Sequence, residues 1–213
     1  MSDHAIADAT DVQRALELTD WRRRIAELYA SVRANPDPAD AWHAWRAERE
    51  RLYLGHPQSP LPREQRTADH APRYFEYDPA WRVLADVMPH DATAVSLPAS
   101  AGGDFGVRAL GTVRFAAGGV ALQLALHWLT DYAGGVLVSY RDSTSGTETY
   151  GAGRYLLDTA KGADLGADGG RLVLDFNFAY QPSCSYDPQW ACPLPPRENW
   201  LAIPIRAGEK TTS

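Results

Sequence analysis

Alternation of apolar and polar residues marks the chain from Thr93 onward and limits its fold more than any other feature. The pattern recurs in short runs separated by glycine-containing turns, such as the Ala-Ala-Gly-Gly stretch after Phe115. Period-two patterning indicates strands with one apolar and one polar face. About seven strands are expected, at residues 93–97, 107–115, 119–129, 135–142, 148–157, 171–178 and 200–208.

Strands at this spacing predict an antiparallel meander that closes as a barrel or curls strongly. A further aromatic-rich stretch, residues 73–83, indicates one strand or a pair of short strands before the meander. No alternation of strands and helices is visible, which argues against a dinucleotide-binding α/β fold.

Two helices are predicted ahead of the strands. The first begins at Thr10 and is expected to break near Thr19 and Asp20, where the helical spacing of apolar residues slips. The second runs from Pro38 to about residue 53, with Asp37 placed to cap it. One face of this second helix carries Trp42, Trp45, Arg49, Leu52 and Tyr53.

The expected fold class is therefore α+β and mainly β. An N-terminal helical segment, residues 1–55, packs on a barrel-like or strongly curled sheet formed by residues 56–213, and the two make one structural unit. Residues 1–9 carry no such pattern and are expected to be disordered.

The charge balance excludes some partners. The chain of 213 residues has 21 basic and 27 acidic side chains and a formal net charge of −6. Nucleic-acid binding needs a basic patch, and the basic side chains cluster only at residues 22–24. No leader sequence or membrane-spanning apolar run is evident, so a cytoplasmic protein without a membrane partner is expected.

Cys184 and Cys192 leave three interpretations open. A zinc site would need two further ligands from scattered histidines, and a catalytic thiolate would need a distant base. A structural pair that stiffens its loop, reduced or bridged, is the preferred interpretation. The usual nucleotide, zinc-protease and serine-hydrolase motifs are absent from the sequence, and no cofactor or metal is expected.

Polar residues gather in two segments, YRDSTSGTETYGAGRYL at 140–156 and LDFNFAYQPSCSYDPQWACPLPPREN at 174–199. Glycines and prolines frame both, which is typical of loops that carry a site on a β-scaffold. The candidate acid, base or hydroxyl-donor residues are Asp175, Glu198 and Tyr155. The candidate ligand-binding residues are Arg141, Asp142, Thr144, Tyr150, Arg154, Asn177, Tyr180 and Asn199.

These two segments, together with HPQSPL at 56–61 and PIRAGEK at 204–210, resemble the bacterial and archaeal family known as domain of unknown function 1684. The resemblance runs from about Trp45 to Lys210. It implies no established activity, substrate or cofactor. It does imply that the candidate residues, with Cys184 and Cys192, form one constellation.

Two functions follow from this reading. In the first, a small-molecule pocket at one open end of the barrel binds an anionic ligand through Arg141 or Arg154, and acid/base catalysis there is left open. In the second, the same polar residues form a stabilising network and the protein is a non-enzymatic interaction or structural module. Tryptophans on the helices would then form a partner surface, although docking onto the sheet is the preferred role for them. A homodimer is a further option.

Overall fold

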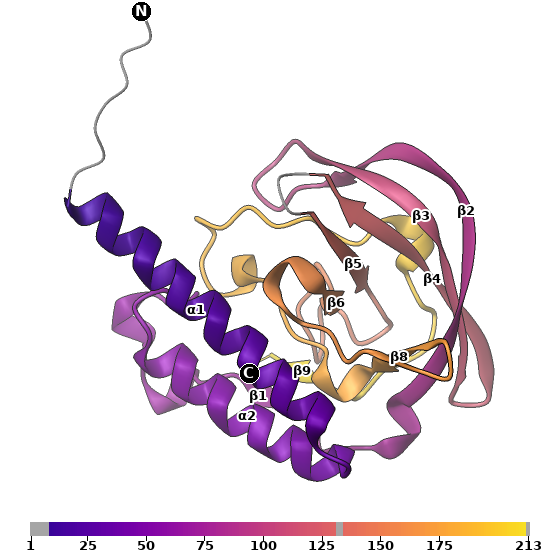
Figure 1. The fold of residues 1–213 in the computed structure, drawn as a ribbon, viewed down its shortest axis with the longest axis horizontal. Coiled ribbons are helices and arrows are strands. Elements are labelled where there is room, and N and C mark those ends of the chain that lie inside the picture. Colours follow the sequence, from indigo (N-terminus) through magenta and orange to yellow (C-terminus); the bar gives the residue numbers. More distant parts are fainter. Residues whose placement is uncertain (1–8, 131–133, 212–213) are drawn as a thin grey trace, which may run out of the picture.

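The computed structural model describes residues 9–130 and 134–211. Two helices, α1 (Ala9–Ala34) and α2 (Pro38–Gly55), precede a strand-rich remainder of the chain. The helices lie side by side against one flank of a curved sheet (Figure 1). The α+β, mainly β class expected from the sequence is confirmed.

Helix α1 is one unbroken helix of 26 residues, so the predicted break near Thr19 and Asp20 is wrong. Thr19 Oγ1 donates to Ala15 O at 2.9 Å, and Asp20 accepts from Arg24 Nε at 2.6 Å. Both polar side chains therefore find partners within one turn of the helix. Ala9 is helical, and the rest of the predicted disordered N-terminus lies outside the described residues.

Helix α2 begins and ends where its sequence signals predict. Asp37 accepts hydrogen bonds from Ala39 N at 2.9 Å and Asp40 N at 3.1 Å, and Pro38 stands in the first turn. Trp42 and Trp45 are 0% exposed. Both tryptophans therefore dock α2 onto the sheet rather than forming a partner surface.

Seven strands form one antiparallel sheet in the order β6-β5-β4-β3-β2-β8-β7. The strands are β2 (Arg82–Pro98), β3 (Asp104–Ala117), β4 (Val120–Leu129), β5 (Gly135–Tyr140), β6 (Arg154–Asp158), β7 (Ala167–Asp168) and β8 (Arg171–Asp175). A separate two-stranded pairing joins β1 (Arg73–Tyr74) to β9 (Glu209–Lys210), which ties the chain terminus to the segment after α2.

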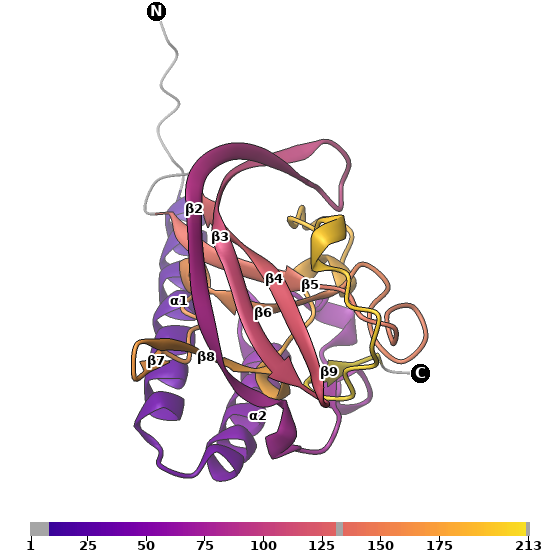
Figure 2. The same ribbon diagram turned by 90° about the vertical axis from the view of Figure 1, so that its right-hand side faces the viewer.

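Strand β2 gives the sheet its curvature. Its first residues, Arg82–Ala85, pair with β8, while Asp86–Pro98 pair with β3. An irregularity between Pro89 and Thr93 bends the strand over the top of the sheet (Figure 2). Among the described residues the edge strands β6 and β7 do not pair with each other, so the sheet curls without a closed hydrogen-bonded ring.

Three of the expected strands differ from the observed ones. Residues 148–153 form turns before β6, and Phe176–Phe178 form a short 3-10 helix after β8. Residues 200–208 contain no strand, although their alternation predicted one. Backbone carbonyls of this segment accept hydrogen bonds from a buried arginine instead of from a neighbouring strand.

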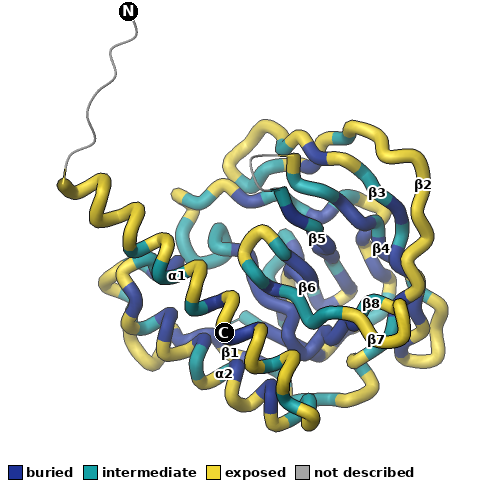
Figure 3. The backbone as a smooth tube through the Cα atoms, in the orientation of Figure 1, coloured by how far each residue is buried: buried dark blue, intermediate teal, exposed yellow. Residues whose placement is uncertain are grey.

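Apolar side chains fill the concave side of the sheet. One cluster joins Val113, Leu124 and Phe176 to Ile205 of the irregular C-terminal segment. A second cluster joins the two helices to the other end of the sheet. Burial is concentrated in β5, β6 and the buried face of α2, whereas β2 and the outer face of α1 are exposed (Figure 3). No helix in the described ranges is both long and apolar enough to cross a bilayer.

Candidate functional site

Arg154 and Asp142 form a buried ion pair within the first polar segment, residues 140–156. Arg154 Nη2 donates to Asp142 Oδ2 at 2.6 Å, and Arg154 is 1% exposed. The guanidinium also donates to the carbonyls of Ile205, Ala207 and Glu209. Asp142 Oδ1 accepts from both Thr144 N and Thr144 Oγ1. This arrangement holds the C-terminal segment in place of a strand ladder.

Two asparagines form hydrogen bonds with backbone groups where a strand ladder is missing. Asn199 accepts from Ala125 N at 2.6 Å and donates to Ser139 O at 2.7 Å, which bridges β4 and β5 where their ladder has ended. Asn177 donates to Asp78 O at 2.8 Å and accepts from Asp78 N at 3.0 Å. Both asparagines are 0% exposed, and each amide is occupied by backbone partners.

Asp175 caps the 3-10 helix that follows β8. Its Oδ1 accepts from Asn177 N at 3.0 Å and Asn177 Nδ2 at 2.8 Å, while Oδ2 lies 3.7 Å from Arg82 Nη1. Burial raises the pKa of Asp175 from 3.8 to about 6 against these favourable contacts. The folded protein therefore holds this proton more tightly than the unfolded chain.

Asp175→Asn should stabilise the protein at neutral pH. The amide keeps an acceptor for Asn177, and the half-exposed Arg82 pair that it loses contributes little. The pKa of Asp175 is raised in the folded state, so the protonated side chain stabilises the wild-type fold. This stabilisation is fully present below about pH 4 and is lost as the pH rises through about 6. We expect the variant to gain about 2–3 kcal/mol at pH 7 and nothing at pH 4, measured by urea unfolding. Asp91→Asn, at an exposed position of β2, is the control, and an Asp175→Asn gain that does not vary with pH would contradict the expectation.

The remaining candidate residues are spread over the molecule. Glu198 is exposed, and the Arg141 guanidinium lies 4.2 Å from the Trp200 ring centroid. Tyr155 Oη donates to Pro193 O at 2.7 Å, and Tyr180 Oη donates to Asp158 Oδ2 at 3.2 Å. Tyr150 Oη lies 3.8 Å from Cys184 Sγ. The structure therefore brings Tyr155, Tyr180 and Cys192 into one cluster and leaves Arg141 and Glu198 on other surfaces.

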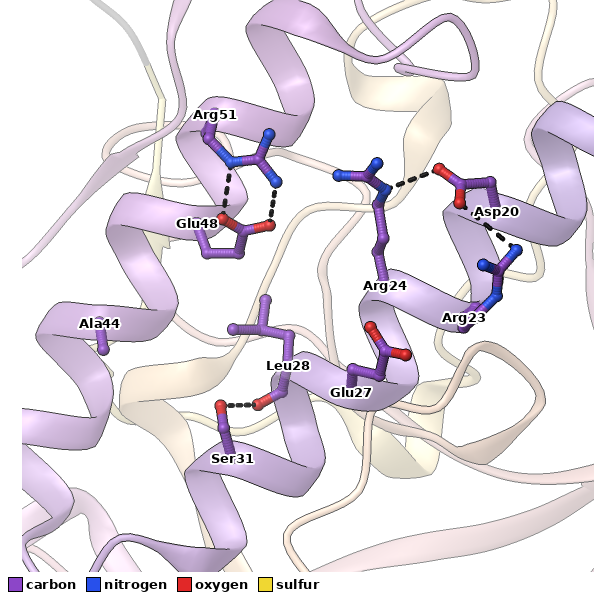
Figure 4. A pocket seen from close by; sticks show the side chains of 9 residues that line it. All are labelled: Asp20, Arg23, Arg24, Glu27, Leu28, Ser31, Ala44, Glu48 and Arg51. Atoms are coloured by element: carbon purple, nitrogen blue, oxygen red, sulfur yellow. Dashed lines mark hydrogen bonds and ion pairs between the residues drawn. The ribbon is translucent and has the colours of Figure 1, made fainter.

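A shallow groove between α1 and α2 is lined by charged residues that pair with one another (Figure 4). Asp20 accepts from Arg24 at 2.6 Å, and Arg51 donates to Glu48 at 2.5 Å. The lining holds three arginines and three carboxylates, so the groove offers a ligand no net charge.

A second pocket, of about 320 Å³, lies between α1, the end of α2 and the loop that carries the cysteines. Its apolar lining includes Leu18, Trp21 and Ile25 of α1 and Ala163 and Ala191 from the far side. A volume of this size lies in the range of small-molecule sites. Among the candidate ligand-binding and catalytic residues, only Tyr180 lines this pocket in the described part of the chain.

Arg49 of α2 lines the inner part of the pocket and is 4% exposed. Its Nη2 donates to Glu209 Oε2 at 2.9 Å and to Tyr53 Oη at 2.6 Å, and its Nε donates to Tyr74 Oη at 2.9 Å. Within the described residues Nη1 has no hydrogen-bond partner. The guanidinium also lies over the rings of Tyr53 and Tyr180, at 4.5 and 4.7 Å from their centroids.

Arg22 and Lys161 also line the pocket, and none of its described lining residues is a carboxylate. Lys161 Nζ lies 3.5 Å from Asp158 Oδ2, and its side chain is 48% exposed. Trp190 Nε1 at the wall is buried and has no hydrogen-bond partner among the described residues. The pocket thus combines apolar walls with three cationic side chains and an unpaired indole donor. Arg49 and Lys161 are paired with Glu209 and Asp158 outside the lining, which leaves Arg22 as the lining cation without a carboxylate partner among the described residues.

Sequence reasoning placed Arg49 on the buried face of its helix but missed its part in a site, and it missed Glu209 as its partner. The signal was present: a charged residue on an apolar face at helical spacing from Trp45 and Tyr53 must find a partner when buried. In the described part of the chain no group of three or more His, Cys, Asp or Glu side chains is arranged to hold a metal ion.

The fold and these buried networks define an α+β protein with two helices docked on a curled antiparallel sheet. A sequence profile described as "Protein of unknown function (DUF1684)" matches residues 70–210, and the chain belongs to this family. The chain is also similar to the solution NMR structure of an uncharacterized protein from Haloarcula marismortui, with 35% identity and a TM-score of 0.59. That match covers 79% of this chain and 91% of the other. A search of curated proteins found no match.

Proposed function

We propose that the protein binds an anionic small molecule with a largely apolar body in the pocket between α1 and the cysteine-bearing loop. The observation that carries the proposal is the lining itself, in which the described residues place three cationic side chains and no carboxylate around apolar walls, while Glu209 and Asp158 pair with two of the cations from outside it. An anionic head group would contact Arg49 Nη1 or Lys161, and the body would lie against the α1 side chains.

The anionic ligand expected from the sequence thus has support, but at a different place. The pocket lies on the helical side of the molecule rather than at an open end of the curled sheet. Asp175, Glu198 and Tyr155 do not line it, so the proposal is binding without a catalytic step. The acid/base roles of these three residues stay predictions.

A second role concerns the polar residues around Arg154, for which we propose the stabilising network considered from the sequence. The proposal is supported by the hydrogen bonds of Arg154, Asn177 and Asn199, most of which are made to backbone groups. Groups held in this way have little capacity left for a ligand.

The binding proposal can be tested with decanoate and its neutral amide, decanamide, which share one chain length and differ in charge. We expect decanoate to bind more tightly by about tenfold, because the cations and the unpaired donor favour a carboxylate. Isothermal titration calorimetry measures both affinities. Lys161→Gln should reduce the preference severalfold, and added salt should weaken it because the Lys161 side chain is half exposed.

Ala191→Trp is the variant that blocks the pocket, because Ala191 is exposed at its wall and a larger side chain there need not disturb the core. Ala44→Trp introduces the same side chain in the charged groove between the helices and is the matched control. We expect the first variant to abolish decanoate binding and the second to retain it. Equal binding of decanoate and decanamide would overturn the anionic preference, and binding unaffected by Ala191→Trp would overturn the location.

A further inference from the structure

Cys184 and Cys192 lie on one irregular loop, and Cys184 packs against the hydrophobic cluster that contains Cys192. Cys184 belongs to the 3-10 turn Ser183–Ser185 and is partly exposed, while Cys192 is buried at 3% exposure. Both thiols are free. An exposed thiol beside a buried one is the arrangement in which the first can be attacked from solvent and the second can react only with its neighbour.

Hydrogen bonds from the end of β2 hold the loop around this pair. Cys192 N donates to Ser100 Oγ at 2.9 Å, Ser100 N donates to Cys192 O at 3.0 Å, and Ser100 Oγ donates to Trp190 O at 3.1 Å. Tyr150 Oη approaches Cys184 Sγ at 3.8 Å from the other side. The sulfur of Cys184 thus has a phenol hydroxyl on one side, while the residue packs against the cluster that contains Cys192.

These neighbours favour the thiolate of Cys184. Interaction with the Cys192 thiol, followed by the nearby hydroxyls of Ser100 and Tyr150, lowers the pKa of Cys184 to about 6, although burial opposes the shift. The same interaction with Cys184, together with burial, raises the pKa of Cys192. When one of the two thiols loses its proton, Cys192 therefore keeps its own and Cys184 becomes the thiolate. The partly exposed sulfur of Cys184 is the nucleophile.

We propose that Cys184 and Cys192 form a dithiol site that undergoes thiol–disulfide exchange with low-molecular-weight disulfides, with Cys184 attacking and Cys192 resolving. This activity goes beyond ligand binding in the pocket and does not depend on it. The geometry that supports it is the partly exposed Cys184 with Tyr150 at its sulfur and the buried Cys192 anchored beside it.

The exchange proceeds in two balanced steps. The Cys184 thiolate attacks one sulfur of a disulfide RSSR, a Cys184–SR bond forms, and RS⁻ leaves and takes a proton from water. With Cys184 no longer anionic, the interaction that holds the proton on Cys192 is lost. Cys192 then releases its proton, its sulfur attacks Cys184, and a second RS⁻ leaves. Two protein thiols are oxidised to one disulfide while RSSR is reduced to two thiols.

Glutathione disulfide added to the folded full-length chain tests the proposal, with intact mass as the readout. The wild-type protein should lose two hydrogen atoms and keep no adduct. Cys192→Ser should hold one glutathione on Cys184, because the resolving thiol is missing, and Cys184→Ser should react at least about tenfold more slowly. Circular dichroism melts of all variants show whether each is folded under the reaction conditions.

The pH dependence separates a reactive site from a merely accessible cysteine. At pH 6 the folded protein should react roughly tenfold faster than the urea-unfolded chain, since the gain in thiolate outweighs the lower nucleophilicity of an acidic thiol. Tyr150→Phe keeps the ring and should shift the midpoint of the rate profile to higher pH. Equal rates for wild type and Cys184→Ser, a stable adduct without an internal disulfide in the wild type, or a midpoint near that of a free thiol would each overturn the proposal.

Discussion

Replacing Arg154 with methionine destabilises the folded protein by about 3–5 kcal/mol in our expectation, the largest effect among the predicted substitutions. The variant leaves the Asp142 carboxylate, which is 0% exposed, without its cation. It also removes the donor from the carbonyls of Ile205, Ala207 and Glu209. An unpaired buried charge and unsatisfied buried carbonyls are both costly, because no water reaches them.

Arg206→Met is the matched control for this substitution. Arg206 also pairs with a carboxylate, that of Glu148 at 2.9 Å, but the two side chains are 60% and 39% exposed. The same chemical change should therefore destabilise the protein far less than it does at Arg154, because an exposed ion pair is screened by water. Urea unfolding followed by tryptophan fluorescence measures both variants. Equal losses would mean that the buried pair does not hold the C-terminal segment, and the stabilising role proposed for it would be abandoned.

The double variant Asp142→Leu with Arg154→Met refines the result. Removing both charges leaves no unpaired ion, so it should be less destabilising than the sum of the two single variants. A purely additive outcome would indicate that the backbone hydrogen bonds of Arg154, rather than the ion pair, carry the effect.

Gly208→Ala is expected to cost more than about 3 kcal/mol. Gly208 has a φ of +79°, and a Cβ added there would lie 2.5 Å from Phe176 O and 2.6 Å from Ala179 O. Those oxygens belong to the backbone and cannot rotate away, and the left-handed conformation adds about 1–2 kcal/mol for a residue with a Cβ. The C-terminal segment would have to move away from the turn after β8.

Gly169→Ala provides the control for conformation alone. Gly169 also has a positive φ, of +55°, but an added Cβ would meet nothing within 4 Å. This variant should lose only about 1–2 kcal/mol, so the difference between the two measures the close approach at Gly208. The two free energies of unfolding come from the same urea titrations, and similar values for both would show that the turn after β8 yields to the added methyl group.

Local sequence patterns predicted the elements whose structure depends on residues close together in the chain. Alternation at 107–115 and 119–129 predicted β3 and β4, because each strand needs one apolar face for the core. The Asp37 and Pro38 signals predicted the start of α2, since capping depends on residues next to each other in the chain. The break in α1 was predicted wrongly because side chains within the helix satisfy Thr19 and Asp20.

The polar segments show how composition can single out residues without assigning their roles. The sequence predicts ligand binding for four polar residues because glycines and prolines frame them: Asp142, Arg154, Asn177 and Asn199. In the fold they lie in the interior, and their hydrogen bonds go mainly to backbone groups. A polar residue in a loop and a polar residue that replaces a strand ladder have the same appearance in a sequence.

The sequence by itself determined the fold class, the strand-rich second half, the second helix and the family, because these depend on periodicity and local motifs. Only the tertiary structure decided that residues 200–208 are irregular and that Arg154 holds them. It also assembled the cationic pocket from α1, Arg49, Lys161 and the cysteine-bearing loop. The physical reason is that each of these features is a contact between segments far apart in the chain, and no local pattern specifies which distant groups will meet.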